Sequence, residues 1–274
     1  MAGAMIGEGT SYPDLTYTDR LTEEEYGIGC RKGSDLAQYI NCVLGDAYQS
    51  GTMQKLAQQY GITEELLVPQ QESTFTTGED SDVSYIQQKG TLVVGITEFA
   101  PMDYKDENGQ WIGFDADLAK LVAERLGVEI QFVVIDWGQK INELDSKAID
   151  VVWNGMTITD ERKKSWDFST PYRTDYVGLM VKKRSGFTSI EDLDGKVIGV
   201  SQGATTQGLI EQMIKDNGFS CKPEFRAFSG YPIIKSSLDA GNIDVFAMDR
   251  STLAGYMNET VELLQPEVKF GEQG

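Results

Sequence analysis

Apolar strand segments alternate with amphipathic helices along the middle of the chain, and this alternation limits the fold more than any other feature. Residues 91–96 (TLVVGI) form a continuous apolar run, typical of a parallel strand covered on both faces. Residues 114–126 have helical periodicity and end before a glycine, which is a helix-stop signal. A strand at 129–135, a helix at 139–147 and a strand at 149–153 complete a β-α-β-α-β series. The series predicts an α/β fold whose ligands bind at the carboxyl ends of the strands.

A second, smaller α/β series follows residue 184, and residues 176–183 (YVGLMVKK) predict an extended crossover between the two. Its predicted elements are a short helix at 190–193, a strand at 196–200, a helix opened by 203–206 and running to about 217, a strand at 224–228, a helix at 231–240 and a strand at 244–248. The chain is therefore expected to form two α/β units.

The composition excludes several classes of function. The formal net charge is −19, with 43 acidic and 24 basic residues, so the chain repels phosphate backbones and anionic lipid. There is no histidine, which removes histidine-based triads, histidine acid–base catalysis and most zinc or iron sites. No EF-hand spacing occurs. We therefore expect no nucleic-acid partner, no metal and no cofactor.

Three cysteines and the chain start give further limits. Cys30, Cys42 and Cys221 cannot all pair, whether Cys30 and Cys42 pair stays open, and buried thiols are the simplest interpretation. No stretch of about 18 apolar residues occurs, so no membrane span is predicted. Residues 1–6 lack a basic region and resemble a cloning remnant rather than a signal peptide.

The segment 153–172 (WNGMTITDERKKSWDFSTPY) is the richest in binding groups. A strand is predicted to end at Trp153, a polar corner follows at 154–157, and Thr159 caps the next helix. Arg162 lies within reach of that corner and can hold a carboxylate through two parallel hydrogen bonds. The alternative is an ordinary strand-to-helix turn with a solvated arginine.

Several segments together resemble the polar amino-acid family of extracellular solute-binding proteins, the capture components of ABC importers. They are TLVVGITEFAPMDY, GFDADLAKLVAERLG, NGMTITDERKKSWDFSTPY, SIEDLDGKVIGVSQGATT, LDAGNIDVFAMD and YGIGCRKGSDL. The resemblance covers residues 84–274 and about 21–60. It implies a two-lobed periplasmic-binding-protein fold, in which each lobe is a mostly parallel sheet flanked by helices and two hinge strands join the lobes.

The order of these segments departs from the family. The segment resembling 26–62 comes last in family members and first here, and residues 68–82 read as a flexible linker joining the original termini. We infer a circular permutation, for which an engineered origin is favoured over a natural one. The larger lobe is then expected at 26–180 and the smaller at 1–25 plus 181–274, with hinge strands near 177–181 and 26–29. Both 15–25 and 261–273 resemble the segment that leads into the return strand, and the sequence does not choose between them.

The resemblance carries binding roles to the larger lobe. Phe99 and Trp137 match aromatic walls around the ligand side chain, although each could equally be a core residue. Asn154 and Gly155 match positions that meet the ligand's amine or side chain. Thr157 and Arg162 match the hydroxyl and the guanidinium that contact its carboxylate.

On the smaller lobe, the resemblance points to the start of a helix and the end of a strand. Gly203, Ala204 and Thr205 match N–H donors to the carboxylate, as the dipole of a helix N-terminus favours, although the glycine could simply form a turn. Asp249 matches the acid that pairs with the α-ammonium, or it is a surface carboxylate or helix cap. Arg162 and Asp249 would suit a zwitterion that drives closure of the lobes.

The expected function is non-catalytic capture of a free polar amino acid. Gln202, Asn154 and Glu98 are candidates for side-chain recognition, and glutamine or the bulkier cystine is favoured over basic amino acids. The resemblance also implies a monomer, docking on an ABC permease, and an exported parent that is lipid-anchored at the cell surface or periplasmic, whereas the chain as written is expected to be soluble. The alternatives are an enzyme resembling cyclohexadienyl dehydratase, with Glu98 or Asp249 as acid or base, and a permuted sensor scaffold.

Overall fold

A computed structural model describes residues 23–69, 75–77, 81–253, 255–257 and 260–264. The chain forms two compact units, unit 1 containing residues 24–175 and unit 2 the residues from 176 onward. The expectations for residues 1–22, for most of the linker at 68–82 and for 265–273 lie outside the described residues. The division after Asp175 comes earlier than the expected lobe boundary at 180.

Unit 1 is built on a mostly parallel sheet. Its strands are β1 (Glu23–Arg31), β6 (Val151–Thr157), β2 (Thr91–Ile96) and β5 (Glu129–Val134), neighbours in that order. Strand β2 is parallel to both β5 and β6, while β1 runs antiparallel to β6 and to β7 (Trp166–Phe168). The predicted parallel core is therefore confirmed, with one antiparallel edge added by the first described strand.

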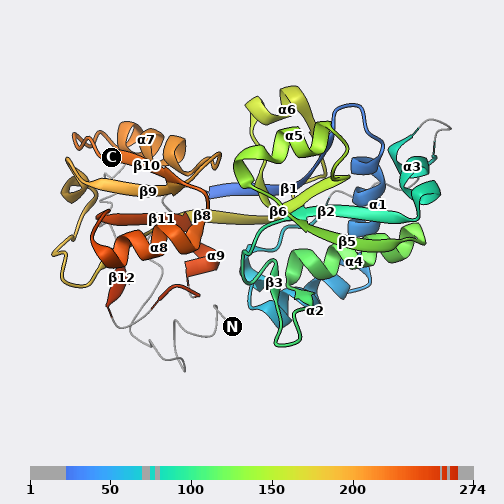
Figure 1. Cartoon of the computed structure of the whole chain (residues 1–274), viewed down its shortest axis with the longest axis horizontal. Helices are drawn as coiled ribbons and strands as arrows, with labels where there is room; N and C mark the ends of the chain where they lie inside the picture. The colour runs from blue at the N-terminus through green and yellow to red at the C-terminus, as the bar shows by residue number, and fades with distance from the viewer. Residues whose placement is uncertain (1–22, 70–74, 78–80, 254, 258–259, 265–274) are drawn as a thin grey trace, which may run out of the picture. The chain divides into compact units, whose positions relative to one another are not determined.

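Helices cover both faces of this sheet (Figure 1). Helix α4 (Phe114–Leu126) contacts β2, β5 and β6, and α1 (Leu36–Gln49) and α2 (Thr52–Tyr60) pack against α4. On the other face, α5 (Lys140–Asp145) lies over β6 and α6 (Asp160–Ser165) lies next to β7. The remaining elements are η1 (Thr63–Glu65), α3 (Asp82–Lys89), η2 (Trp137–Gln139) and the hairpin of β3 (Tyr104–Lys105) and β4 (Trp111–Ile112).

Strand β6 extends farther than the sequence predicts. The expectation of a strand end at Trp153 and a polar corner at 154–157 is wrong, because the strand continues through Thr157. The cause is β1, which pairs Tyr26 with Thr157 and Gly27 with Met156. A partner strand so distant along the chain is invisible to local sequence patterns.

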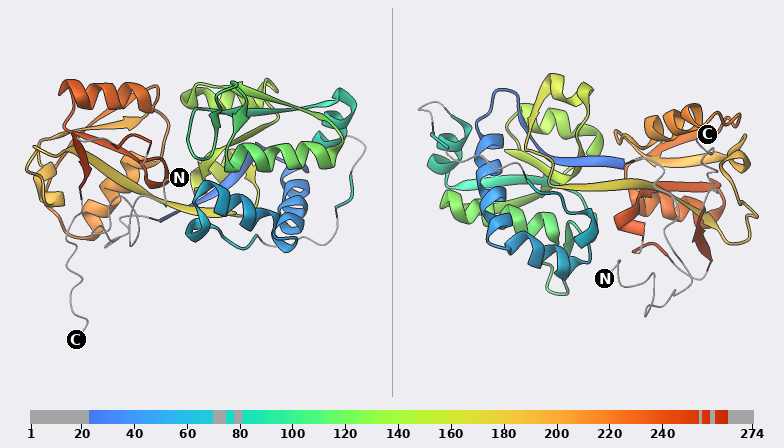
Figure 2. Two further views of the ribbon diagram at one scale, coloured as in Figure 1. Left: turned by 90° about the horizontal axis from the view of Figure 1, so that it is seen from below. Right: turned by 180° about the vertical axis from the view of Figure 1, so that it is seen from behind.

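Unit 2 has a second sheet with the order β10 (Glu224–Phe228), β9 (Val197–Ser201), β11 (Val245–Asp249) and β8 (Arg173–Lys182). Strands β10, β9 and β11 are parallel, and β8 is antiparallel to β11 and to β12 (Val261–Leu263). The helices are η3 (Ile190–Leu193), α7 (Thr206–Asp216), α8 (Tyr231–Ala240) and α9 (Arg250–Leu253). Helices α7 and α8 lie on opposite faces of these strands (Figure 2). They pack over separate apolar clusters, one including Ile210 and the other Ile234.

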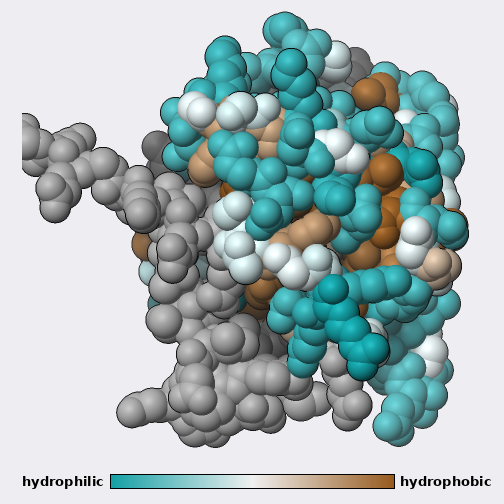
Figure 3. All heavy atoms as spheres, turned by 90° about the vertical axis from the view of Figure 1, so that its left-hand side faces the viewer, coloured by the Kyte–Doolittle hydropathy of each residue, from teal (hydrophilic) through white to brown (hydrophobic). Residues whose placement is uncertain are grey.

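Two further findings concern the surface and the thiols. The face of unit 2 in Figure 3 is mainly hydrophilic, with small apolar areas between polar side chains. Among the described helices, none is long and apolar enough to cross a membrane. Cys30, Cys42 and Cys221 are free thiols, and burial raises the pKa of Cys30 and of Cys221, so the question of a Cys30–Cys42 bridge is answered in the negative here.

Candidate functional site

The carboxyl ends of the parallel strands in unit 1 gather the residues expected to bind a ligand. Phe99 follows β2, Trp137 follows β5, and residues 154–157 form the end of β6. Since β5, β2 and β6 are neighbours and parallel, these three ends lie along one edge of the sheet. Unit 1 thus brings five of its predicted residues to one edge, and the sixth, Arg162 in the following helix, is hydrogen-bonded to Thr157 at that edge.

The Asn154 side chain forms hydrogen bonds with the segment that follows β2. Its side-chain oxygen accepts from the backbone N–H of Thr97, and its amide donates to the Thr97 hydroxyl at 2.9 Å. Asn154 is 5% exposed. Both ends of the amide are therefore bonded to Thr97 and fix this edge of the sheet.

At this edge of the sheet, two aromatic side chains pack closely against Gly155. It has a φ of 56°, and a Cβ there would lie 2.6 Å from the Phe99 ring and 3.0 Å from the Tyr26 ring. Its N–H donates to the Asp115 carboxylate at 3.0 Å. Phe99 is 4% exposed, so most of its ring is a packing partner of this glycine.

A buried polar network lies behind Gly155. Asp115 and Asp103 are both fully buried, and Asp115 also accepts from the Tyr172 hydroxyl at 2.8 Å. Neither carboxyl oxygen of Asp103 has a hydrogen-bond partner within the described part of the chain. Burial, together with the Asp115 and Asp117 carboxylates, raises the pKa of Asp103 well above its ordinary value.

Thr157 and Arg162 are held together at the end of β6. The Arg162 guanidinium donates to the Thr157 carbonyl at 2.8 Å, and the Thr157 hydroxyl donates to Glu24 at 2.7 Å. The Thr159 hydroxyl accepts from the Arg162 N–H, which confirms the predicted helix cap. The hydrogen bond from the Thr157 hydroxyl to Glu24, which uses the single proton of that hydroxyl, was not predicted from the sequence.

Trp137 lies beside the positively charged side chain of Lys140. Its ring is half-buried against the cluster that includes Leu144 and Trp166. The Lys140 ammonium lies 4.5 Å from the ring centroid and donates to the Trp137 carbonyl at 2.9 Å. Lys140 is 4% exposed, and burial together with the nearby Arg162 charge lowers the pKa of Lys140 to about 7. Sequence reasoning missed Lys140, although its position three residues after an aromatic ligand-wall candidate was an available signal.

On unit 2, the predicted residues lie at the ends of two neighbouring parallel strands, β9 and β11. Gln202 and Gly203 are exposed, and Gly203 has a φ of 76°, so a turn precedes the helix. Helix α7 begins at Thr206, later than the predicted opening at 203, and the side chain of its N-cap residue Thr205 makes no capping bond. The N–H of Ala204 donates to the Ser201 carbonyl at 3.2 Å.

Asp249 ends β11 at the same edge of the unit 2 sheet. It is half-buried and hydrogen-bonds the hydroxyl of Tyr231, the first residue of α8. Tyr231 was not predicted as a site residue, and no local pattern links it to Asp249. On unit 1, Glu98 is exposed beside Phe99.

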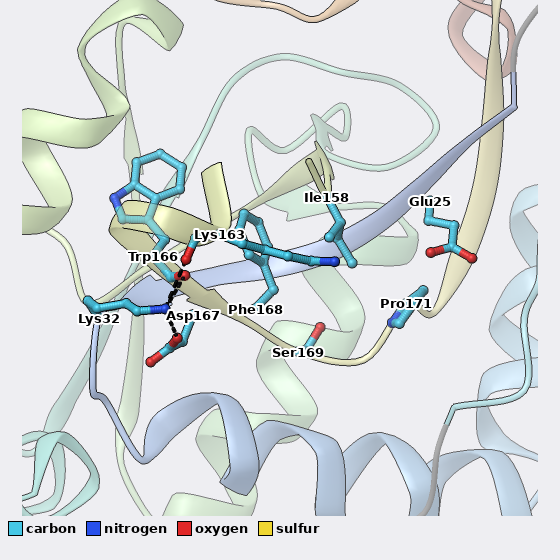
Figure 4. A pocket seen from close by; sticks show the side chains of 9 residues that line it. All are labelled: Glu25, Lys32, Ile158, Lys163, Trp166, Asp167, Phe168, Ser169 and Pro171. Carbon is cyan, nitrogen blue, oxygen red and sulfur yellow. Dashed lines mark hydrogen bonds and ion pairs between the residues drawn. The ribbon is translucent and has the colours of Figure 1, made fainter. Parts of the chain in front are cut away.

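A hollow of about 340 Å³ on unit 1 contains none of the predicted residues (Figure 4). Its lining includes Lys32, Asp167 and Ile158. The Lys32 ammonium donates to the Asp167 carboxylate at 2.8 Å and to the Lys163 carbonyl at 2.9 Å. These bonds tie β7 and α6 to the end of β1, so the Lys32 and Asp167 side chains stabilise the fold of unit 1.

No group of three or more histidine, cysteine, aspartate or glutamate side chains that could hold a metal ion occurs among the residues for which the structure gives positions.

The α/β fold, with helices on both faces of a mostly parallel sheet, matches that of solved amino-acid-binding proteins. The chain belongs to the bacterial extracellular solute-binding proteins, family 3, whose model matches residues 92–267. The resemblance stated from the sequence is thereby confirmed at the level of the family.

Individual relatives are named for different amino acids. The chain is 33% identical over 182 residues to the L-cystine-binding protein TcyJ of Escherichia coli strain K12, covering 65% of this chain and 66% of that protein. It therefore spans just under two thirds of the length of that relative. An ancestral arginine-binding protein bound to arginine is 39% identical with a TM-score of 0.57, covering 64% of this chain and 78% of that one.

A third relative bears on the alternative that the chain is an enzyme resembling cyclohexadienyl dehydratase. The ancestral amino-acid-binding protein AncCDT-1, described as a precursor of cyclohexadienyl dehydratase, is 34% identical with a TM-score of 0.59, covering 67% of this chain and 80% of that one. Its name, like those of the cystine and arginine relatives, is that of a binding protein, the class that the sequence predicted.

Proposed function

We propose that this protein binds a free amino acid without chemical change, for delivery to an ABC importer. One observation carries the proposal: the Arg162 guanidinium is fixed at the carboxyl end of β6 by the Thr157 carbonyl, at the strand edge where ligands bind in open α/β sheets. A positioned guanidinium is suited to grip a carboxylate with two hydrogen bonds.

The second charge of the ligand is assigned to Asp249. In our proposal the α-ammonium binds this carboxylate on unit 2, while the N–H groups of the turn at 203–205 contribute to the carboxylate. Because Arg162 and Asp249 belong to different units, a ligand that needs both would favour a closed arrangement. Phe99 and Trp137 are proposed to contact the ligand side chain.

The side-chain preference is proposed to be neutral polar or cystine-like rather than basic. Relatives of this chain are named for cystine and for arginine, so family membership alone does not identify the preferred amino acid. Glu98, which precedes Phe99 in the chain, is exposed, and exposure weakens its influence on a bound cation.

The proposal is tested by a thermal-shift screen of refolded protein against the common amino acids, cystine and ornithine. A ligand that binds the native state raises its apparent stability, and refolding removes any amino acid that copurified. We expect a shift with one or a few amino acids that is lost in both Arg162→Ala and Asp249→Ala. Absence of a shift in folded protein would contradict the proposal.

We also propose that the segment order is a circular permutation. Two observations support it: the family match begins at residue 92, and the earlier strand β1 pairs with β6 and β7 of the matched region. The test is sedimentation combined with limited proteolysis. A folded monomer with residues 24–67 protected supports the permutation, whereas an exchanged dimer, or a core from which 24–67 is readily cleaved, contradicts it.

A further inference from the structure

Lys140 is a buried cation in the part of unit 1 where a ligand side chain is expected. It is the first residue of α5 and is 4% exposed. Its ammonium lies 2.9 Å from the Trp137 carbonyl and 4.5 Å from the centroid of the Trp137 ring. A cation above an indole face is attracted to the ring, which fixes the position of the ammonium beside this aromatic side chain.

Arg162 brings a second positive charge to the same place. Helices α5 and α6 lie next to each other over one face of the unit 1 sheet (Figures 1 and 2). The Arg162 charge acts on Lys140 strongly enough to help burial lower the pKa of Lys140 to about 7. The Asp136 carboxylate acts in the opposite direction on the pKa of Lys140, and its Oδ1 accepts a hydrogen bond from the Gly138 N–H.

Two neighbouring cations have a direct consequence for recognition. A ligand has one α-carboxylate, and the proposed function assigns it to Arg162. A positively charged ligand side chain near Trp137 would meet the Lys140 charge at short range, where like charges cost free energy. A negatively charged group would be attracted to that charge, because a buried cation is stabilised by a close anion.

We propose that Lys140 is a specificity-determining residue of the amino-acid site, whose ammonium binds a second carboxylate carried by the side chain of the ligand. This inference rests on the proposed function and deepens it by naming the ligand class. The second carboxylate has two sources, a dicarboxylic amino acid such as glutamate or the distal half of cystine. Arginine, lysine and ornithine are disfavoured by the same charge.

The titration of Lys140 makes the inference measurable. Only the protonated amine attracts a carboxylate, and the pKa of Lys140 in the free protein is about 7. At pH 6 the site is mostly charged, whereas at pH 8.5 a proton has to be taken up on binding. The affinity for a ligand with a second carboxylate should therefore fall by about tenfold or more over this interval.

Isothermal titration calorimetry of refolded full-length protein at pH 6 and pH 8.5 tests the inference. The ligands are L-cystine, L-glutamate, L-glutamine and L-arginine, and cystine and glutamate distinguish the two sources of the second carboxylate. The variants are Lys140→Met, which keeps the volume without the charge, and Lys140→Arg, which keeps the charge at both pH values.

We expect cystine or glutamate to bind at least about tenfold more tightly than arginine at pH 6. Lys140→Met should weaken that ligand by about tenfold and remove its pH dependence, with less than about threefold effect on glutamine. Lys140→Arg should retain affinity at both pH values. Tightest binding of arginine by the unaltered protein, or unchanged cystine and glutamate affinity in Lys140→Met, would overturn the inference while leaving amino-acid binding intact. Failure of all four ligands with folded protein would refute the inference together with the proposed function.

Discussion

The two units present their candidate binding groups in different ways. On unit 1, the side chains of Asn154, Thr157 and Arg162 are each held by a hydrogen bond to another residue of the same unit. On unit 2, the candidates are an exposed turn at 202–203 and one strand-end carboxylate, Asp249. In the proposed function, unit 1 therefore fixes the geometry of recognition in advance, whereas unit 2 contributes mainly a charge and backbone N–H groups.

The largest effect on binding is expected from Arg162→Ala. Removing the partner of a desolvated carboxylate costs about 2 to 5 kcal/mol of binding free energy. Asp249→Ala on unit 2 should cost less, about 1 to 3 kcal/mol, since Tyr231 and solvent share that carboxylate. Calorimetric titration with the ligand found by screening measures both. The exposed Lys164→Ala in the same helix as Arg162 is the control. A larger loss for Asp249→Ala would reverse the comparison between the units.

Two glycines with similar backbone conformation, one in each unit, should differ in how much an alanine substitution lowers stability. Gly155 on unit 1 and Gly218 on unit 2 have φ values of 56° and 70°, but only Gly155 has side chains in the way of a Cβ. Alanine at either position costs about 1 to 3 kcal/mol of backbone strain. Gly155→Ala should cost a further ~1 to 3 kcal/mol, because Phe99 and Tyr26 must move. Urea unfolding measures both variants, and equal losses would contradict the close packing at Gly155.

The buried network of unit 1 predicts a pH dependence of stability through Asp103. Its folded-state pKa is raised by burial, so the folded protein binds more protons than the unfolded chain above the ordinary aspartate pKa. The free energy of unfolding therefore falls as pH rises from about 4 toward the raised pKa. Asp103→Asn should remove this part of the decline, so its stability relative to the unaltered protein rises with pH. Urea titrations from pH 4 to pH 9 test it, and parallel profiles would contradict a raised pKa.

The smallest effect is expected at the helix that carries Arg162. Thr159→Ala removes the hydroxyl that accepts from the Arg162 N–H and should lower the free energy of unfolding by about 1 kcal/mol. Thr159→Ser keeps the capping oxygen and should restore most of the loss. A Thr159→Ala variant as stable as the unaltered protein would show that the fixed position of Arg162 does not depend on the cap.

Much of each unit was predictable because local patterns carry the information. The apolar run at 91–96, the helical stripe at 114–126 and the cap at Thr159 depend on neighbouring residues only, and each is found as expected. The end of β6 was not predictable from position 153 onward, because its pairing partner at 26–27 is far away in the chain. Helix α7 begins later than expected, since the positive φ of Gly203 belongs to a turn.

For the candidate site, residue types were easier to predict than roles. The predicted residues of unit 1 do gather at one strand edge, yet the Asn154 amide is used by Thr97 and the Thr157 hydroxyl by Glu24. Those partners come from other strands, and sequence spacing contains no record of them. Lys140 was missed because a lysine in a polar helix start is ordinarily solvated, whereas here it is buried beside Trp137.

The decisive measurement is a crystal structure of the protein with its bound amino acid. We expect the ligand carboxylate within hydrogen-bond distance of the Arg162 guanidinium, the ammonium on Asp249, and the side chain beside Trp137. An amino acid bound instead in the hollow lined by Lys32 and Asp167, or at any place away from Arg162, would contradict this expectation.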